Sequence, residues 1–223
     1  MEKEFWEARY KKEGIVFRDA DGSRIDTSGR GSIGIVRAWK WKIIGEMIRK
    51  YSPELIKPDS KQIQSKIIDV GCGDLSFWDD ESHTILVEEY TGIDFCDTVI
   101  MENRGQDVKG WNFIASPAQI LMDGLKAPVV LCMDLLFHVM DDMGFIKTLK
   151  NLCYYSEDLI LIHTWKYNPF KDMPPEKETG EGIYMKYRPL EAYFGIFMGR
   201  GFMLMEEILN PNKVGVLYVF KRV

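Results

Sequence analysis

The chain has 223 residues, 46% of them hydrophobic and 28% charged, with 34 acidic against 29 basic side chains and a net charge of −5. This composition excludes a wholly disordered chain and is sufficient for one large domain or two small ones. The acidic balance argues against a broad basic groove for nucleic acid, and no apolar run approaches the roughly 20 residues of a membrane span.

The first 62 residues are predicted to form an N-terminal helical cap. They contain a glycine-rich stretch over residues 22–34, which a helical pattern follows. Apolar residues recur in that pattern at helical spacing, which predicts one buried face: Ile35, Trp39, Ile43, Met47 and Ile48. We interpret the neighbouring Lys40 and Lys42 as the outer face of this helix, which Pro53 and Pro58 end.

From about residue 66 the chain alternates short apolar runs with segments long enough for crossovers. The runs cover residues 67–70, 90–94, 111–115, 129–133 and 159–162, and residues 143–153 have helical spacing. Continuous apolar strands separated by crossovers are typical of a parallel sheet buried on both faces. Residues 202–209 and 214–219 are two strand-like runs around a turn signal at 210–213. The prediction is a single α/β domain: a doubly wound, Rossmann-like, seven-stranded sheet with an antiparallel C-terminal hairpin, whose core is residues 63–223.

A glycine-bearing turn follows the first apolar run directly, with the sequence Asp-Val-Gly-Cys-Gly-Asp at residues 69–74. Glycines at the carboxyl end of a strand let the backbone approach a ligand closely. Asp94 ends the second run, where a carboxylate can accept hydrogen bonds from both hydroxyls of a ribose. Together these features indicate a nucleoside-cofactor site, and the alternative is a purely structural turn.

The side chains of the turn distinguish between cofactors. The dinucleotide fingerprint has a third glycine where this chain has Ser76, and the neighbouring Leu75 and Phe77 are too bulky for a diphosphate. Asp69, two residues before the first glycine, suits a ligand that carries an amine or a cation. This pattern fits S-adenosylmethionine better than NAD.

Four segments resemble the class I S-adenosylmethionine-dependent methyltransferases, in the branch that acts on small molecules. Residues 68–74 look like the family's first motif, residues 91–94 like its second, and residues 131–139 like its fourth-strand motif. The opening is similar to a recurring N-terminal pattern of that branch, with Trp6, Tyr10 and the Ser-Gly-Arg-Gly-Ser run at 28–32. The resemblance covers nearly the whole chain and implies both the fold and the cofactor.

The resemblance also implies which residues hold S-adenosylmethionine. Asp69 would bind the methionine amine, the glycine turn would pass beneath the cofactor, and Asp94 would bind the ribose. The full set of implied cofactor residues is Asp69, Gly71, Cys72, Gly73, Asp94, Phe95, Ser116, Pro117, Ala118 and Met133. Two positions depart from the family: Leu75 replaces a glycine, and the segment after the third strand has no acid for the adenine.

The N-terminal glycine-rich segment is a candidate lid. Residues 29–32 could fold over the cofactor, with Arg30 or Arg37 reaching the methionine carboxylate. The alternative is a flexible linker before the helix that follows.

Methyl transfer is an in-line displacement, so the protein has mainly to align the nucleophile, the methyl carbon and the sulfur. His138 is predicted as a base or substrate ligand, or else as a residue that holds its loop. Asp134 is predicted to orient the acceptor, with a helix-capping role as the alternative. Trp165, Tyr184 and Arg188 are predicted to line the substrate pocket, although Arg188 could instead pair with a surface acid.

The methyl acceptor is expected to be a small molecule with an oxygen or nitrogen nucleophile. The alternatives are an RNA or protein methyltransferase and a relative that binds the cofactor without catalysis. We expect neither a nucleic-acid nor a membrane partner, and we expect the protein to be a monomer or homodimer.

The four cysteines lie at least 21 residues apart, so we expect reduced thiols and no metal site. The charged start is unlike a signal peptide, so we expect a cytoplasmic location.

Overall fold

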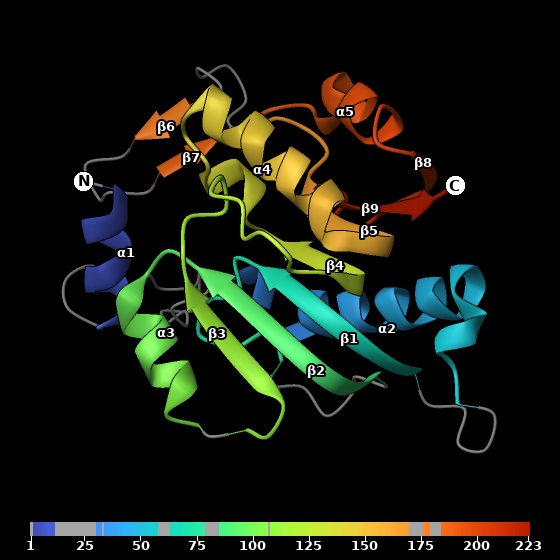
Figure 1. Cartoon of the computed structure of the whole chain (residues 1–223). Helices are drawn as coiled ribbons and strands as arrows, with labels where there is room; N and C mark the ends of the chain where they lie inside the picture. Colours follow the sequence, from blue (N-terminus) through green and yellow to red (C-terminus); the bar gives the residue numbers. More distant parts are fainter. Residues whose placement is uncertain are drawn as a thin grey trace.

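A computed structural model describes residues 2–11, 30–32, 34–57, 63–78, 85–106, 108–169, 176–178 and 184–223. A seven-stranded sheet runs through the molecule (Figure 1), with strand order β3-β2-β1-β4-β5-β9-β8. Its strands are β1 (Ile63–Val70), β2 (Ile85–Asp94), β3 (Trp111–Ala115), β4 (Ala127–Met133), β5 (Ser156–Trp165), β8 (Phe202–Leu209) and β9 (Gly215–Arg222). The first five are parallel, and β9 is antiparallel to both β5 and β8. The predicted doubly wound sheet with a C-terminal hairpin is therefore confirmed.

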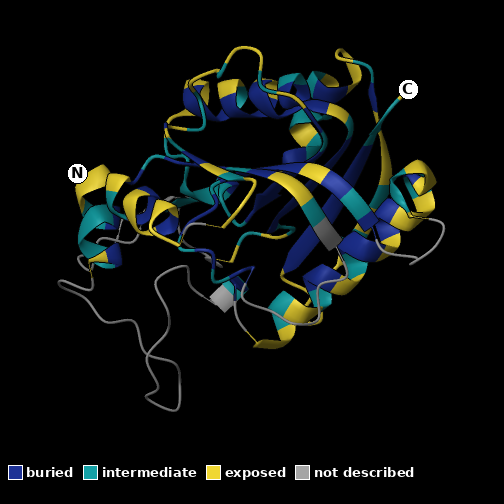
Figure 2. Cartoon of the chain, turned by 60° about the horizontal axis from the view of Figure 1, so that its bottom comes forward, coloured by how far each residue is buried: buried dark blue, intermediate teal, exposed yellow. Residues whose placement is uncertain are grey.

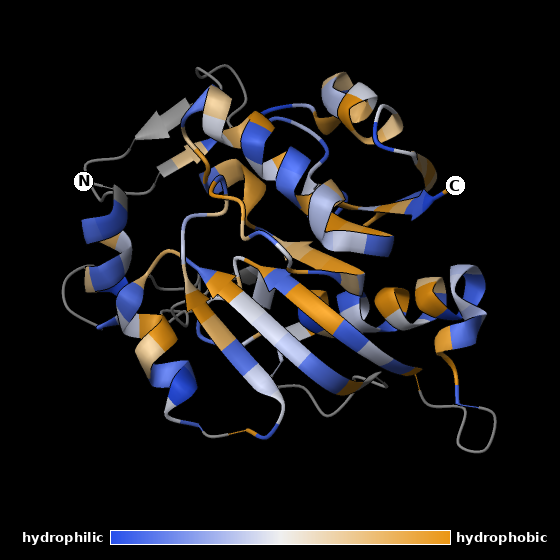
Figure 3. Ribbon diagram, in the orientation of Figure 1, coloured by the Kyte–Doolittle hydropathy of each residue, from blue (hydrophilic) through white to orange (hydrophobic). Residues whose placement is uncertain are grey.

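Helices cover both faces of the sheet. The longer helices are α1 (Glu2–Tyr10), α2 (Gly34–Tyr51), α3 (Asp97–Arg104), α4 (Asp142–Tyr155) and α5 (Phe194–Met198). One buried apolar cluster joins residues of α1, α2 and α3 to one face, and a second joins residues of α4 and α5 to the other. Figure 2 shows the sheet between these layers, and Figure 3 shows that α2 and α4 each carry hydrophobic and hydrophilic residues. The structure thus has three layers.

Short elements connect the main ones. Four 3₁₀ turns are described: η1 (Arg30–Ser32), η2 (Pro53–Leu55), η3 (Leu136–His138) and η4 (Leu190–Tyr193). Between β5 and η4 the chain forms a small two-stranded antiparallel sheet of β6 (Glu176–Glu178) and β7 (Tyr184–Lys186). Within the described part of the chain, no helix combines the length and apolarity needed to cross a membrane.

The α2 helix differs from its prediction in which face is buried. Ile35 is 75% exposed, whereas Lys40 is fully buried beside Trp41 and Ile44. The expectation that Lys40 faces outward is therefore wrong, whereas Lys42 is exposed as expected. A lysine can be buried when a partner neutralises its charge, and that partner lies in the pocket described next.

Candidate functional site

A cavity of about 340 Å³ opens at the carboxyl ends of β1, β2 and β4, and α1 and η1 form its other walls. This is the edge at which open α/β sheets hold their ligands. The cavity is lined by Lys3, Trp6, Tyr10, Ser32, Asp69, Gly71, Cys72, Gly73, Phe77, Asp94, Phe95, Pro117, Ala118, Gln119, Met133, Asp134, Leu135, His138, Val139, Met140 and Asp141. Its wall therefore brings together both predicted catalytic residues and nine of the ten predicted cofactor residues; Ser116 is buried nearby.

The glycine turn after β1 has a backbone that requires its glycines. Gly71 has φ of 83° and Gly73 has φ of 54°, which lie in the left-handed region. A Cβ atom on Gly71 would also lie 2.9 Å from the Cβ atom of Leu135. Leu75, at the position where the resembling family has glycine, has φ of 61° and a buried side chain. The turn therefore keeps a left-handed backbone at Leu75 without a glycine.

Two buried aspartates flank this turn. Asp69 Oδ2 accepts hydrogen bonds from Trp78 Nε1 at 2.8 Å and from the Tyr90 hydroxyl at 3.0 Å. Asp94 accepts from the backbone N–H groups of Gly73 at 3.1 Å and Cys96 at 3.0 Å. Burial raises the pKa of each carboxyl to about 6. Both carboxylates are thus fixed in direction at the cavity wall, and their ionised forms are favoured by a cationic or hydrogen-bond-donating ligand.

The segment after β3 forms the wall next to β2. Pro117, Ala118 and Gln119 line the cavity there. Asn151 Nδ2 on α4 donates to the Ala118 carbonyl at 2.8 Å, which anchors the segment to the second helical layer. This wall presents backbone, apolar groups and the Gln119 amide, and the Ser116 hydroxyl that the sequence offered for an adenine does not line it.

Asp134 follows β4 and is held from two sides. Lys40 Nζ donates to Oδ2 at 2.5 Å, and His163 Nδ1 on β5 lies 2.5 Å from Oδ1. Although burial alone would raise it, the pKa of Asp134 is held well below its usual range by the Lys40 ammonium and the His163 ring. Asp134 is therefore a fixed anion on the cavity wall. Sequence reasoning missed Lys40 and His163, which lie 94 and 29 residues away from Asp134.

His138 ends η3 and lines the cavity. Its ring meets that of Trp6 edge to face, with centroids 4.8 Å apart. This contact packs His138 against the N-terminal helix, α1.

Two of the three predicted substrate residues, Trp165 and Arg188, do not line the cavity. Trp165 stacks on Phe137 at a centroid distance of 4.0 Å and is not on the cavity wall. The side chain of Tyr184 lies outside the described residues, although its backbone begins β7. Trp165 therefore packs against η3 through Phe137.

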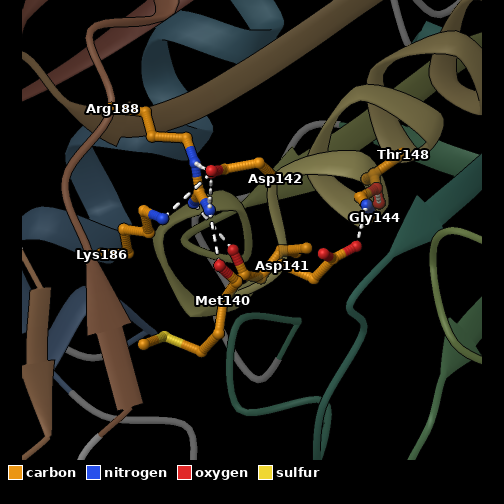
Figure 4. Close-up of polar contacts among 8 residues, drawn as sticks. Met140, Asp141, Asp142, Gly144, Thr148, Lys186 and Arg188 are labelled. Atoms are coloured by element: carbon orange, nitrogen blue, oxygen red, sulfur yellow. Dashed lines mark hydrogen bonds and ion pairs between the residues drawn. The ribbon is translucent and has the colours of Figure 1, made fainter.

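Arg188 is buried and holds the cavity wall instead of lining it (Figure 4). Its Nη1 and Nη2 groups donate to the Val139 and Met140 carbonyls, each at 2.7 Å. Its Nε and Nη2 groups donate to Asp142 Oδ1, the pairing with an acid that the sequence left open. Asp141 caps α4 by accepting from the Gly144 N–H group.

Polar contacts between α1 and α3 hold the N-terminal helix beside the cavity. Glu7 accepts from the backbone N–H groups of Asp97 at 2.7 Å and Thr98 at 3.2 Å, at the start of α3. Lys3 pairs with Asp97 at 2.7 Å. These contacts dock α1 so that Trp6 and Tyr10 line the cavity, which their spacing of four residues in the sequence could have indicated.

The proposed lid residues are partly described. Ser32 lines the cavity, and the Arg30 side chain lies outside the described residues. Arg37, the other candidate for the methionine carboxylate, donates from Nη1 to the Ser76 carbonyl at 2.7 Å. Arg37 thus ties α2 to the turn after β1.

Comparison with known proteins reveals similarity in structure alone. No family model matches the chain, and no curated protein of similar sequence was found. An amino pentose methyltransferase from Micromonospora echinaspora, solved with S-adenosylmethionine bound, is similar over 86% of this chain and 94% of its own, with a TM-score of 0.66 and 12% identity. The magnesium protoporphyrin IX methyltransferase of Synechocystis PCC 6803, solved with S-adenosylhomocysteine, is similar over 99% of this chain and 94% of its own, with a TM-score of 0.61 and 12% identity. The N-methyltransferase NodS of Bradyrhizobium japonicum WM9 covers 83% of this chain and 94% of its own, with a TM-score of 0.56 and 10% identity.

These similarities agree with the observed strand order and with the resemblance found in the sequence motifs. The chain has the Rossmann-like fold of the class I S-adenosylmethionine-dependent methyltransferases.

Proposed function

We propose that the protein is an S-adenosylmethionine-dependent methyltransferase whose acceptor is a small molecule. The observation that carries the proposal is the charge of the cavity. Among its described lining residues, four aspartates face one lysine: Asp69, Asp94, Asp134 and Asp141 against Lys3. S-adenosylmethionine carries a sulfonium and an ammonium group, so this wall attracts it. The diphosphate of a dinucleotide would meet the same carboxylates with like charge.

The proposed pose follows the sheet. The cofactor would occupy the crevice over the glycine turn, with its ribose at Asp94 and its adenine by Pro117 and Ala118. Its methyl group would then point towards β4, where Asp134 and His138 stand. The structural neighbours act on an amino pentose and on a porphyrin, which supports a small-molecule acceptor. We propose further that residues 1–223 act as one domain in the cytoplasm, as a monomer or homodimer.

Calorimetry tests the cofactor directly. We expect S-adenosylmethionine and S-adenosylhomocysteine to bind, and NAD not to bind. Asp94→Ala should weaken S-adenosylmethionine binding by about 2–4 kcal/mol, because two charge-assisted hydrogen bonds to the ribose are lost. Asp123→Ala is the matched control, since Asp123 is an exposed carboxylate that does not line the cavity. Tight NAD binding without S-adenosylmethionine binding would overturn the proposal.

A second experiment identifies the acceptor. The protein is incubated with cell extract and methyl-labelled S-adenosylmethionine, and labelled products are found by mass spectrometry. A labelled small molecule supports the proposal. Label in RNA, with binding that weakens steeply in salt, would favour the RNA alternative. Cofactor binding without any labelled product would indicate a relative that has lost catalysis.

A further inference from the structure

We propose that Lys40 and His163 are positioning residues that hold the Asp134 carboxylate in one direction on the cavity wall, where it binds the N–H group of an amine acceptor. The inference rests on the proposed function and goes beyond it, because it names the chemical class of the acceptor.

The backbone of Asp134 is strained. Its φ of 59° lies in the left-handed region, which a residue with a Cβ atom adopts at a steric cost. Its N–H group donates to the His163 carbonyl at 3.0 Å, so β5 holds the backbone as well as the side chain. A strained non-glycine residue at the edge of a cavity is a common mark of a functional position.

The Asp134 carboxylate is largely buried between its two partners. The Lys40 side chain is fully buried and that of His163 is 5% exposed, whereas the Asp134 side chain keeps 16% exposure and lines the cavity. On the lid side, a Cβ atom on Gly31 would lie 1.9 Å from Asp134 Oδ2, so the η1 backbone covers that oxygen closely. Each oxygen accepts one hydrogen bond from the network and has capacity for another. The exposed part of the carboxylate belongs to a residue of the cavity wall.

The protonation of His163 follows from its surroundings. Burial lowers the pKa of His163, which leaves the ring neutral near pH 7. Because a carboxylate only accepts hydrogen bonds, Nδ1 carries the proton and donates to Asp134. Nε2 is buried and meets no hydrogen-bond partner among the residues that the structure describes. The ring therefore acts as a directional donor to Asp134.

A fixed anion at this position suits an amine acceptor. The amine lone pair attacks the methyl carbon as the C–S bond breaks, and the sulfur keeps the electron pair of that bond. Positive charge thus moves from sulfur to nitrogen, whose proton stays in place during the step and passes to water after release. A carboxylate facing the nitrogen stabilises the charge that develops there. A hydroxyl acceptor would have to give its proton to a base, and an anion whose pKa is held low is a weak base.

Two cofactor analogues test the inference without knowledge of the acceptor. S-adenosylhomocysteine lacks the methyl group, and sinefungin carries an ammonium group on carbon in place of the methylsulfonium. The ratio of their dissociation constants therefore measures how strongly the protein attracts an ammonium group at the transfer position. We expect the wild-type protein to bind sinefungin at least about tenfold more tightly, and Asp134→Asn to reduce the preference to within about threefold. Glu191→Gln is the matched control, since Glu191 also pairs with a lysine at 2.5 Å but does not line the cavity.

A positioning role for Lys40 and His163 must be tested by a measurement that a purely structural role would leave unchanged. The titratable groups around Asp134 are Lys40 on α2, His163 on β5, Asp69 on β1 and Cys132 on β4, and His138 lines the same cavity. Lys40→Met removes the main cation, so burial should raise the pKa of Asp134 into the neutral range. The sinefungin preference should then fall as pH is lowered from 8 to 6, whereas the wild-type preference stays constant. His163→Asn keeps a donor for Asp134 and should retain the preference better than His163→Leu.

The outcomes separate the two proposals. If S-adenosylhomocysteine does not bind the wild-type protein, the proposed function fails. If it binds but Asp134→Asn keeps the wild-type preference for sinefungin, or Lys40→Met keeps a pH-independent one, the present inference is wrong. Should either single variant fail to fold, the double variant Asp134→Asn with Lys40→Met removes both buried charges and must still lose the preference.

Discussion

In the proposed function, Asp69 and Asp94 would link cofactor binding to pH. Both carboxyls have pKa values raised to about 6 by burial, and both would bind the proposed cofactor in their ionised forms. At pH 7 most of each group is already ionised, so binding requires little proton release. Below pH 6 each group must lose a proton before it can accept a hydrogen bond from the ligand.

We therefore expect the affinity for S-adenosylmethionine to be constant above about pH 7 and to weaken below pH 6. The dissociation constant should rise by up to about tenfold for each pH unit and each protonated group. Calorimetry between pH 5 and pH 8, in buffers of different ionisation enthalpy, measures both the affinity and the protons released. Asp94→Asn removes one titrating group and should make the pH dependence shallower. Affinity that stays unchanged down to pH 5 would contradict the assignment of both residues.

Leu75 shows how a residue can depart from a motif and keep its geometry. Its left-handed φ of 61° is the conformation that glycine adopts without strain, and its side chain is buried against the same cluster as Phe77 and Trp78. Burial of a leucine side chain is worth about 1.5–3 kcal/mol, against roughly 1–2 kcal/mol for the left-handed backbone. The packing energy thus offsets the strain.

At the scale of elements, the wall between η3 and α4 depends on Arg188. This wall segment, residues 139–141, contains no strand or helix. The neighbouring η3 contacts β7. Three donor groups of Arg188 hold the segment through two carbonyls and Asp142 (Figure 4). Asp142 is 65% exposed, whereas Arg188 is 5% exposed, so the carbonyl contacts are the better shielded ones.

Arg188→Met should lower the free energy of unfolding by about 2–4 kcal/mol, because two carbonyls lose a charged donor. Asp142→Asn, which removes only the exposed partner, should cost at most about 1 kcal/mol. Urea unfolding followed by circular dichroism measures both. Equal losses for the two variants would show that the ion pair, and not the carbonyl contacts, holds the wall.

At the scale of the whole molecule, the N-terminal segment is part of the core. The α2 helix contacts β1, β5 and β9, and its Trp41 and Ile44 belong to the buried cluster on that face. Lys40 on the same helix joins Asp134 at the cavity. A cap that supplies both core and site residues is not expected to separate from the sheet.

We therefore expect the protein to unfold in a single cooperative transition. Five of the six tryptophans pack in or against the cluster on the α2 face, so tryptophan fluorescence reports on that face: Trp6, Trp39, Trp41, Trp78 and Trp111. Far-ultraviolet circular dichroism reports on all helices and strands. The two signals should change at the same urea concentration. Loss of fluorescence at lower urea than loss of circular dichroism would show that the N-terminal segment unfolds separately.

The sequence by itself determined the strands of the sheet and the edge at which the cavity lies. Runs of consecutive apolar residues form strands where both faces of a parallel sheet are buried, as at residues 129–133 of β4, which are all buried. The apolar runs at 111–115 and 202–209 also match the bounds of β3 and β8. Parallel strands end at one edge of the sheet, so the turn after β1 and Asp94 at the end of β2 had to come together there. Local pattern is sufficient for these features, because each depends on neighbouring residues.

Only the tertiary structure decided how the polar side chains pair. Lys40, a charged residue between two tryptophans of α2, becomes buried because Asp134, 94 residues away, accepts its hydrogen bond. Arg188 turns towards the Val139 and Met140 carbonyls instead of the cavity. Periodicity describes the average environment of a helix or strand face, whereas the burial of one charged group depends on a partner brought close by distant parts of the chain.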